Sequence, residues 1–181
     1  MQHIIAALIL LLLLSPGLAA KVAKGANPVQ TVASVDLQRY LGRWYQQAFF
    51  PARFQKADCG KVVTAEYSLL KNGKIRVINT CYSDAAGTVV KRRAQATAYP
   101  VDKTNAKLKV SFFWPFKGDY WIVKLDRKNY SYTVVSDPGR DYLWILTRQM
   151  AIDKKTYEEI TDFLRDNGWD LSRLVFTGKL K

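Results

Sequence analysis

Apolar and polar residues alternate along much of this chain, which is the pattern of β-strands with one buried face. In residues 108–112, Leu108, Val110 and Phe112 alternate with Lys and Ser, and in residues 94–98 three alanines alternate with Gln and Thr. Similar segments, rich in Val, Ile, Thr and aromatic residues, recur along the chain. They predict eight strands, over residues 44–50, 61–69, 74–82, 88–99, 106–113, 119–125, 130–136 and 142–148.

Short turn signals separate these strands. The strongest is Asn72-Gly73, which predicts a two-residue turn with positive φ at both residues and places Cys81 opposite Thr64. Gly and Pro mark further joins in residues 86–87, 115–118 and 138–139. Eight short strands with no helix between them predict an all-β antiparallel fold, either an up-and-down barrel or a sandwich.

One α-helix is predicted near the C-terminus. Asp153 can cap it, and apolar residues follow at spacings of three and four, from Tyr157 through Ile160 to Leu164. Asn167-Gly168 predicts its end, and residues 174–176 predict a short final strand. We expect the helix to lie against the outside of a closed barrel.

The first residues predict a targeting segment that is not part of the fold. Residues 4–14 are an unbroken apolar run, shorter than the about 20 residues that span a bilayer as a helix. Small residues follow, so residues 1–19 are interpreted as a secretory signal peptide, with an uncleaved membrane anchor as the alternative. Residues 20–34 predict a flexible N-terminal arm, and residues 35–181 predict one barrel domain.

The two cysteines and the absence of nearby ligands bear on location and chemistry. An exported protein enters an oxidising compartment, so Cys59 and Cys81 are expected to form a disulfide, which requires residues 56–60 to fold back over a strand pair. Two cysteines and the single histidine, His3, cannot complete a tetrahedral metal site, so no metal is expected. No cysteine lies near the predicted cleavage region, so a periplasmic or secreted protein without a lipobox cysteine for lipid anchoring is expected.

The formal net charge of +13 favours some partners over others. Its basic residues, including the cluster in residues 91–93, form either a solvated surface or one attracted to an anionic membrane. No nucleic-acid recognition motif accompanies them. The apolar segment 113–116 can insert into a membrane, cap the barrel or pack as an ordinary hairpin.

Three short segments, in the expected order, resemble the sequence motifs of the lipocalin family. Residues 40–45 are similar to the motif that opens the lipocalin barrel, with Gly42 and Trp44 in the characteristic positions. Residues 136–146 are similar to the second motif, with Asp137 and Arg140, and Arg148 matches an arginine at the end of the eighth strand. Together they resemble the branch of bacterial lipocalins and apolipoprotein D, over residue 35 to the C-terminus.

The resemblance implies an eight-stranded up-and-down β-barrel that binds a small hydrophobic ligand. In such a barrel Arg148 would stack on Trp44, and both residues would be structural. The bacterial branch is often tethered through a lipobox cysteine, from which this sequence departs.

Strand phase gives candidate ligand contacts. If Trp44 faces the interior, so do the alternate residues after it, and the small alanines in residues 94–98 leave space in such a barrel. Tyr120 and Trp144 add polar-tipped aromatic rings. Ordinary core packing is the alternative for each of them. The predicted ligand-binding residues are Gln46, Ala48, Phe50, Leu108, Val110, Phe112, Tyr120 and Trp144.

The resulting functional prediction is a non-enzymatic protein without a cofactor. It would bind, transport or store a fatty acid, a lysophospholipid or a similar lipid, with a role in maintaining the cell envelope. A lipid-modifying enzyme is one alternative, although the mature chain would lack histidine, which leaves a free Cys81 or an Asp or Glu of raised pKa as the reactive group. A protein-interaction or inhibitor module is the other.

Overall fold

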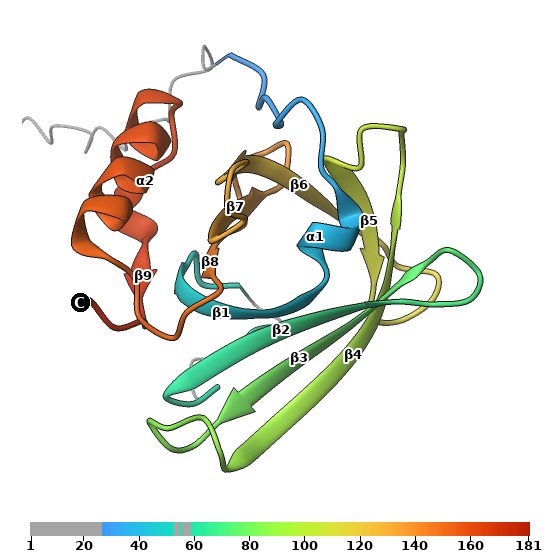
Figure 1. Cartoon of the computed structure of the whole chain (residues 1–181). Coiled ribbons are helices and arrows are strands. Elements are labelled where there is room, and N and C mark those ends of the chain that lie inside the picture. The colour runs from blue at the N-terminus through green and yellow to red at the C-terminus, as the bar shows by residue number, and fades with distance from the viewer. Residues whose placement is uncertain (1–26, 53–54, 56–58) are drawn as a thin grey trace, which may run out of the picture.

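The strands close into a barrel. The computed structural model describes residues 27–52, 55 and 59–181. Neighbouring strands pair in sequence order from β2 to β8, and β1 pairs with both β8 and β2, which closes the sheet (Figure 1). Within the described residues the eight antiparallel strands of the barrel are β1 (Gly42–Phe49), β2 (Val62–Leu69), β3 (Ile75–Tyr82), β4 (Val90–Pro100), β5 (Lys107–Ser111), β6 (Gly118–Leu125), β7 (Tyr132–Ser136) and β8 (Leu143–Thr147).

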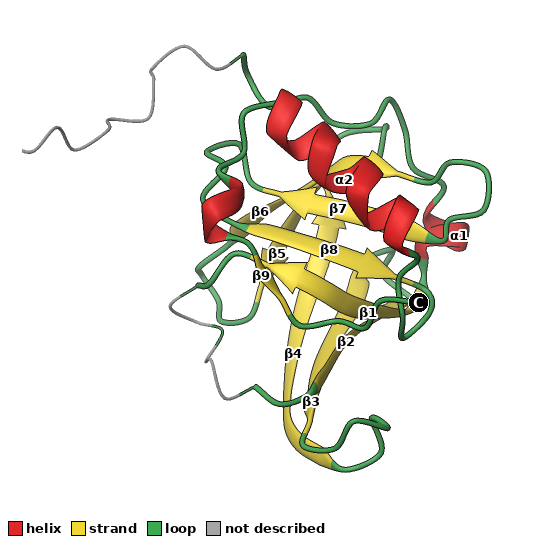
Figure 2. Cartoon of the chain, turned by 90° about the vertical axis from the view of Figure 1, so that its left-hand side faces the viewer, coloured by secondary structure: helices red, strands yellow, loops and turns green. Residues whose placement is uncertain are grey.

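Two hydrophobic clusters lie on opposite sides of the barrel wall. The wall cluster, on the outside, joins residues such as Val134 and Ile145 to Ile160 and Leu164 of helix α2 (Lys154–Asp166). Figure 2 shows α2 lying across β7 and β8. The interior cluster takes one or more side chains from each of the eight strands, among them Trp44, Tyr67, Val77, Ala96, Leu108, Ile122, Val135 and Leu146.

A β-bulge in β1 reverses the direction of its later side chains. Trp44 belongs to the interior cluster, but Ala48 and Phe50 belong to the wall cluster. The pairing of β1 with β8 shifts register just before Ala48, and one extra residue exchanges the two faces of a strand. The prediction that Ala48 and Phe50 face the interior is therefore wrong. Phe49 faces the interior instead, and it pairs with the inward-facing Trp144.

The predicted C-terminal helix is confirmed at both ends. The Asp153 carboxylate accepts a hydrogen bond from the Thr156 amide, Asn167 is the C-cap, and Gly168 has φ 83°. A 3₁₀ turn, η1 (Leu171–Arg173), leads to the predicted final strand, β9 (Val175–Phe176), which pairs with β1.

The short helix α1 (Leu37–Tyr40) was not predicted, because four residues are too few to show helical periodicity. The Asp36 side chain caps it, accepting hydrogen bonds from the Gln38 and Arg39 amides. Figure 1 shows α1 lying across one end of the barrel. None of the described helices combines the length and the apolar composition needed to cross a membrane.

The turn between β2 and β3 differs from the prediction by one residue. Cys81 pairs with Val63, not with Thr64. The loop has three residues, 71–73, of which Gly73 has a positive φ of 77°. A three-residue hairpin loop with glycine in the left-handed conformation is a favoured geometry, so the predicted two-residue turn is wrong.

The N-terminal segment is attached to the barrel over its described part. Val29 is buried in the wall cluster, and the Val32 amide donates to the Ile122 carbonyl at 2.9 Å. Residues 27–34, expected to belong to a flexible arm, therefore pack on the fold. The predicted signal peptide, residues 1–19, and residues 20–26 lie outside the described residues.

Candidate ligand-binding interior

Trp44 closes the α1 end of the barrel. Its side chain is completely buried, and its indole Nε1 donates to the Tyr40 carbonyl at 2.9 Å. The Arg148 guanidinium carbon lies 3.8 Å from the centroid of the Trp44 ring. The guanidinium also donates to the backbone carbonyls of Arg39, Tyr40 and Arg43. The stacking of Arg148 on Trp44 that the resemblance implied is thus present, and it ties α1, β1 and β8 together.

Gly42 allows the chain to enter β1 beside this arginine. Its φ of 92° is strained for any residue with a side chain, and a Cβ there would lie 3.4 Å from the Arg148 Nη1 atom. This end of the barrel is called the floor below.

The residues of the second motif lie between β7 and β8, at the end of the barrel opposite the floor, and their side chains stabilise this loop. Asp137 Oδ2 accepts from the Gly139 amide at 2.9 Å, and Asp137 Oδ1 accepts from the Tyr142 amide at 2.8 Å. The Arg140 side chain donates to the carbonyls of Asn27 and Asn167, which joins the loop to the N-terminal segment and to the end of α2. Asp137 and Arg140 therefore have structural contacts here.

Three tyrosine hydroxyls meet directly above the floor. Tyr120 Oη lies 2.7 Å from Tyr40 Oη and 2.9 Å from Tyr67 Oη, within hydrogen-bond distance of both. We call Tyr40, Tyr67 and Tyr120 the tyrosine triad; they come from α1, β2 and β6. Burial raises the pKa of Tyr40 to about 12, and it raises the pKa values of Tyr67 and Tyr120 well above their ordinary value. The three phenols are therefore neutral at physiological pH.

Part of the barrel interior keeps surface that is accessible to solvent. Seven partly buried side chains pack against the interior cluster, and four of them belong to strands of the barrel. Such inward-facing, partly accessible side chains are the ones that a ligand inside the wall would contact. We call these four residues the interior ring: Ala65, Val110, Tyr120 and Trp144.

Half of the predicted ligand contacts lie inside the barrel. Leu108 is buried in the interior cluster, and Val110, Tyr120 and Trp144 belong to the interior ring. Ala48 and Phe50 lie in the wall cluster.

The two remaining candidates differ in their surroundings. Gln46 pairs with Leu146 of the interior cluster and accepts a hydrogen bond from Gln55, which accepts one from Trp144 of the ring; Gln46 also donates to Thr177. Phe112 follows the last residue of β5, is 39% exposed and lines a hollow outside β4 and β5 together with Thr97 and Ser111, so its predicted inward orientation is wrong.

The sequence reasoning missed Tyr40 and Tyr67. Tyr67 shares an alternating pattern with Val63 and Ala65, so strand phase could have placed it on the inner face. Tyr40 lies in a helix too short for periodicity to reveal, and only its position four residues before Trp44 hinted at a contact.

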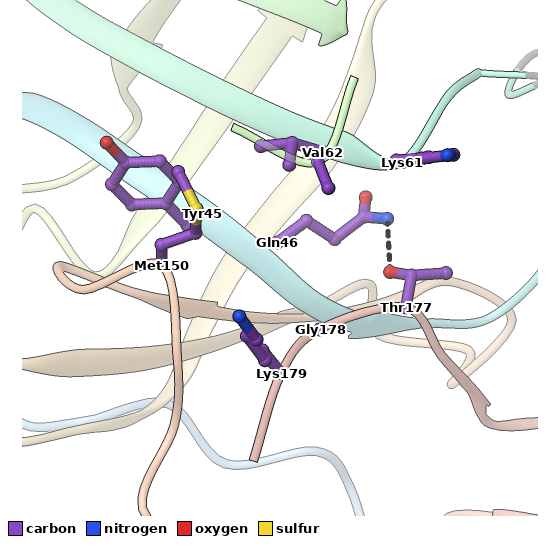
Figure 3. A pocket seen from close by; sticks show the side chains of 9 residues that line it. Tyr45, Gln46, Lys61, Val62, Met150, Thr177, Gly178 and Lys179 are labelled. Atoms are coloured by element: carbon purple, nitrogen blue, oxygen red, sulfur yellow. Dashed lines mark hydrogen bonds between the residues drawn. The ribbon is translucent and has the colours of Figure 1, made fainter. Parts of the chain in front are cut away.

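The described residues form hollows outside the interior cluster. The smaller, about 210 Å³, lies where β1 and β2 diverge, and Figure 3 shows Gln46 bonded to Thr177 within it. The larger, about 640 Å³, lies outside β4 and β5, beside Trp114 and Lys117.

The predicted disulfide is present. Cys59 and Cys81 are bonded, with their Cα atoms 5.2 Å apart, and the bridge ties the connection before β2 to the end of β3. Cys81 is therefore not a free thiol, which removes it as the nucleophile of an enzyme.

The β5–β6 loop presents aromatic side chains to solvent. Phe113, Trp114 and Phe116 are 79%, 87% and 78% exposed. The alternative of an ordinary hairpin packed on its neighbours is therefore wrong for these side chains. Lys117 follows them, with its Nζ 5.3 Å from the Tyr99 ring centroid. Strand order places this loop, together with the β7–β8 loop, at the end of the barrel opposite the floor.

These features define an antiparallel eight-stranded barrel with a closed floor and some partly accessible side chains on its inner face. Residues 35–179 match the family model of the lipocalin-like domain. The chain belongs to the lipocalin family.

Several relatives support this assignment. The outer membrane lipoprotein Blc of Vibrio cholerae is 38% identical over 149 residues, which cover 82% of this chain and 85% of that protein. Apolipoprotein D of Macaca fascicularis is 36% identical over 157 residues, or 83% and 79% of the two chains. The predicted resemblance to the bacterial and apolipoprotein D branch is confirmed.

Solved structures share the fold at low sequence identity. Insecticyanin of the tobacco hornworm Manduca sexta has a TM-score of 0.63 at 20% identity, covering 84% of this chain and 85% of that one. Lobster apocrustacyanin A1 has a TM-score of 0.59 at 21% identity, covering 88% and 93%. The predicted barrel with a C-terminal helix and a final strand is confirmed.

Proposed function

We propose that this protein binds a single-chain lipid inside its barrel and carries or stores it without chemical conversion. The observation that carries the proposal is the interior ring: Val110 and Trp144 offer apolar surface that remains accessible inside a closed wall. An acyl chain placed there would remove this surface from water, which is favourable by about 25 cal/mol per Å². The predicted ligands are a fatty acid or a lysophospholipid.

Two further parts of the proposal concern location and chemistry. The relatives include outer membrane lipoproteins, which supports an exported protein with a role in the cell envelope; the chain would be free in the periplasm or secreted. Transport rather than catalysis is supported by the chemistry of the interior. Its described polar groups include three phenols whose pKa values are raised, which makes them poor bases at neutral pH.

Identification of the natural ligand tests the proposal. The purified protein is extracted with organic solvent, and the extract is analysed by mass spectrometry. Delipidated protein is then titrated with fatty acids and lysophospholipids while tryptophan fluorescence is recorded, since Trp144 lies in the interior ring. We expect saturable binding of about one lipid per chain. No bound lipid and no saturable change would reject the carrier function and favour a protein-interaction module.

A second function, contact with an anionic membrane, is supported by the exposed loop 113–116. Three large aromatic side chains in water are unfavourable for a soluble protein unless a surface covers them. The loop lies at the open end of the barrel, and the net charge of +13 favours an anionic bilayer as that surface. Contact there would bring the barrel entrance to the lipid that it takes up.

A further inference from the structure

The hollow of about 640 Å³ lies on the outer face of the barrel wall, and part of the β5–β6 loop lines it. The side chains that β4 contributes to it, Thr97 and Tyr99, alternate with alanines of the interior cluster. Because successive side chains of a strand face opposite sides, these two point outward. The hollow is therefore separate from the barrel interior and from any ligand held there.

The hollow carries positive charge that the protein does not neutralise. Lys74 of the β2–β3 turn and Lys117 of the β5–β6 loop both line it, and none of its lining residues is acidic. Neither lysine belongs to an ion pair within the described part of the chain. Asp119, the acidic residue nearest to Lys117 in sequence, lies 2.8 Å from the Nζ of Lys109 instead. The hollow therefore favours an anionic group.

Hydrogen bonds hold the turn and the loop that present these lysines. The Lys74 amide donates to Asn72 Oδ1 at 3.1 Å. In the loop, the Phe116 amide donates to the Phe113 carbonyl at 2.9 Å, and Ser111 Oγ donates to the Phe116 carbonyl at 2.8 Å. The two cations are thus carried on a backbone that is ordered before a ligand binds.

Aromatic rings lie beside the cations. Tyr99, Phe112 and Trp114 line the hollow, and the Nζ of Lys117 lies 5.3 Å from the centroid of the Tyr99 ring. Trp114 is 87% exposed. Exposed rings next to lysines are typical of a membrane interface, where the rings lie at the level of the headgroups and the cations attract anionic lipids. Free inorganic phosphate would contact the lysines but would leave the rings in water.

We propose that this hollow binds the phosphate of an anionic phospholipid in a membrane surface, with Lys74 and Lys117 contacting the phosphate and Trp114 lying among neighbouring lipids. The inference rests on the proposed contact of the loop with an anionic membrane and adds a headgroup site to it. Lysine side chains are long and flexible, so ammonium groups from the turn and from the loop can reach one phosphate. This lipid is distinct from the one carried inside the barrel, since the hollow lies on the other face of the wall.

The test compares two double variants that remove the same charge. Lys74→Gln plus Lys117→Gln removes both cations from the hollow. Lys103→Gln plus Lys155→Gln is the matched control, because these exposed lysines lie in the β4–β5 turn and in α2. Each protein is co-sedimented with phosphatidylcholine vesicles that contain phosphatidylglycerol. Each is also titrated with glycerol 3-phosphate, a soluble part of the phospholipid headgroup, while amide chemical shifts are recorded by NMR, and thermal unfolding confirms that each variant is folded.

We expect the hollow variant to bind the anionic vesicles about tenfold or more weakly than the wild type, and the control variant to bind them nearly as well as the wild type. Glycerol 3-phosphate should shift the amides around positions 74 and 117 saturably in the wild type and the control, but not in the hollow variant. Equal vesicle binding by the two double variants, or shifts that spread over the basic surface without saturation, would overturn the headgroup site and leave diffuse charge as the attraction. A wild type that binds no anionic vesicles would reject the proposed membrane contact itself.

Discussion

At the scale of single residues, Trp44 determines the closure of the barrel. Its ring is completely buried between Tyr40 and the Arg148 guanidinium, with a ring-centroid distance of 5.1 Å to Tyr40. Removing it would leave a cavity and would strip one face of the guanidinium of its contact. Because Arg148 bonds to three carbonyls around α1 and β1, the loss would extend to the helix that covers the floor.

The Trp44→Ala substitution should therefore lower the free energy of unfolding by about 3–5 kcal/mol, the usual loss for a buried aromatic side chain. Urea denaturation followed by circular dichroism measures the change. Trp114→Ala is the matched control, since Trp114 is 87% exposed, and its effect should stay within about 0.5 kcal/mol. Similar losses for the two variants would contradict the role of Trp44 in the floor.

The triad also makes stability depend on alkaline pH. The folded-state pKa of Tyr40 is raised to about 12 by burial, while an unfolded tyrosine ionises near its ordinary value of 10.0. Below pH about 10 both states keep the proton, and between about 10 and 12 only the unfolded state loses it, so the free energy of unfolding falls as the pH rises. Urea denaturation across this range should show the fall. The Tyr67→Phe and Tyr120→Phe variants should show a shallower one, and an unchanged slope would contradict ionisation of the triad.

At the scale of elements, local patterns predicted the strands and α2 well. Alternation in residues 108–112, the N-cap of α2 at Asp153 and its C-terminal Asn167-Gly168 are properties of short segments, which a sequence displays directly. The bulge before Ala48 places two predicted ligand contacts, Ala48 and Phe50, on the outer face of the wall instead of the inner one. No local sequence pattern marks this bulge, because it depends on the pairing of β1 with β8. Phe112 continued the alternation of β5, but the strand ends one residue earlier.

Local sequence patterns alone could not predict the floor of the barrel or the tyrosine triad. The family motif gave Trp44 and Arg148, whereas the meeting of Tyr40, Tyr67 and Tyr120 depends on contacts 53 and 80 residues apart in the chain. Such contacts follow from the closed sheet, which a single sequence does not display.

The disulfide joins two elements whose separation in sequence is 22 residues. Closing a loop of this length typically stabilises a protein by about 2–4 kcal/mol, so the Cys59→Ser plus Cys81→Ser variant should unfold at lower urea concentration than the wild type. Wild-type protein treated with reductant under denaturing conditions and refolded in reductant should match the variant. Two free thiols in denatured, unreduced wild-type protein would show that the bond does not form.

At the scale of the whole molecule, the barrel has one closed and one open end, and the exposed aromatic side chains lie at the open end. Trp114 in the β5–β6 loop and Val101 in the β4–β5 turn are both exposed, but they lie at opposite ends of β5. Membrane contact through the open end therefore depends on Trp114 and not on Val101, whereas attraction through net charge alone depends on neither.

Co-sedimentation with vesicles separates these possibilities. Vesicles containing phosphatidylserine should bind the wild type, and Trp114→Ser should reduce the partition coefficient by about tenfold or more, since burying a large apolar side chain contributes about 1.5–3 kcal/mol. Val101→Ser, at 49% exposure in the wild type, should leave it unchanged. Raising the salt concentration should weaken binding of all three proteins, because the charge term is screened. Equal binding of Trp114→Ser and wild type would reject insertion of the loop and leave charge as the sole source of attraction.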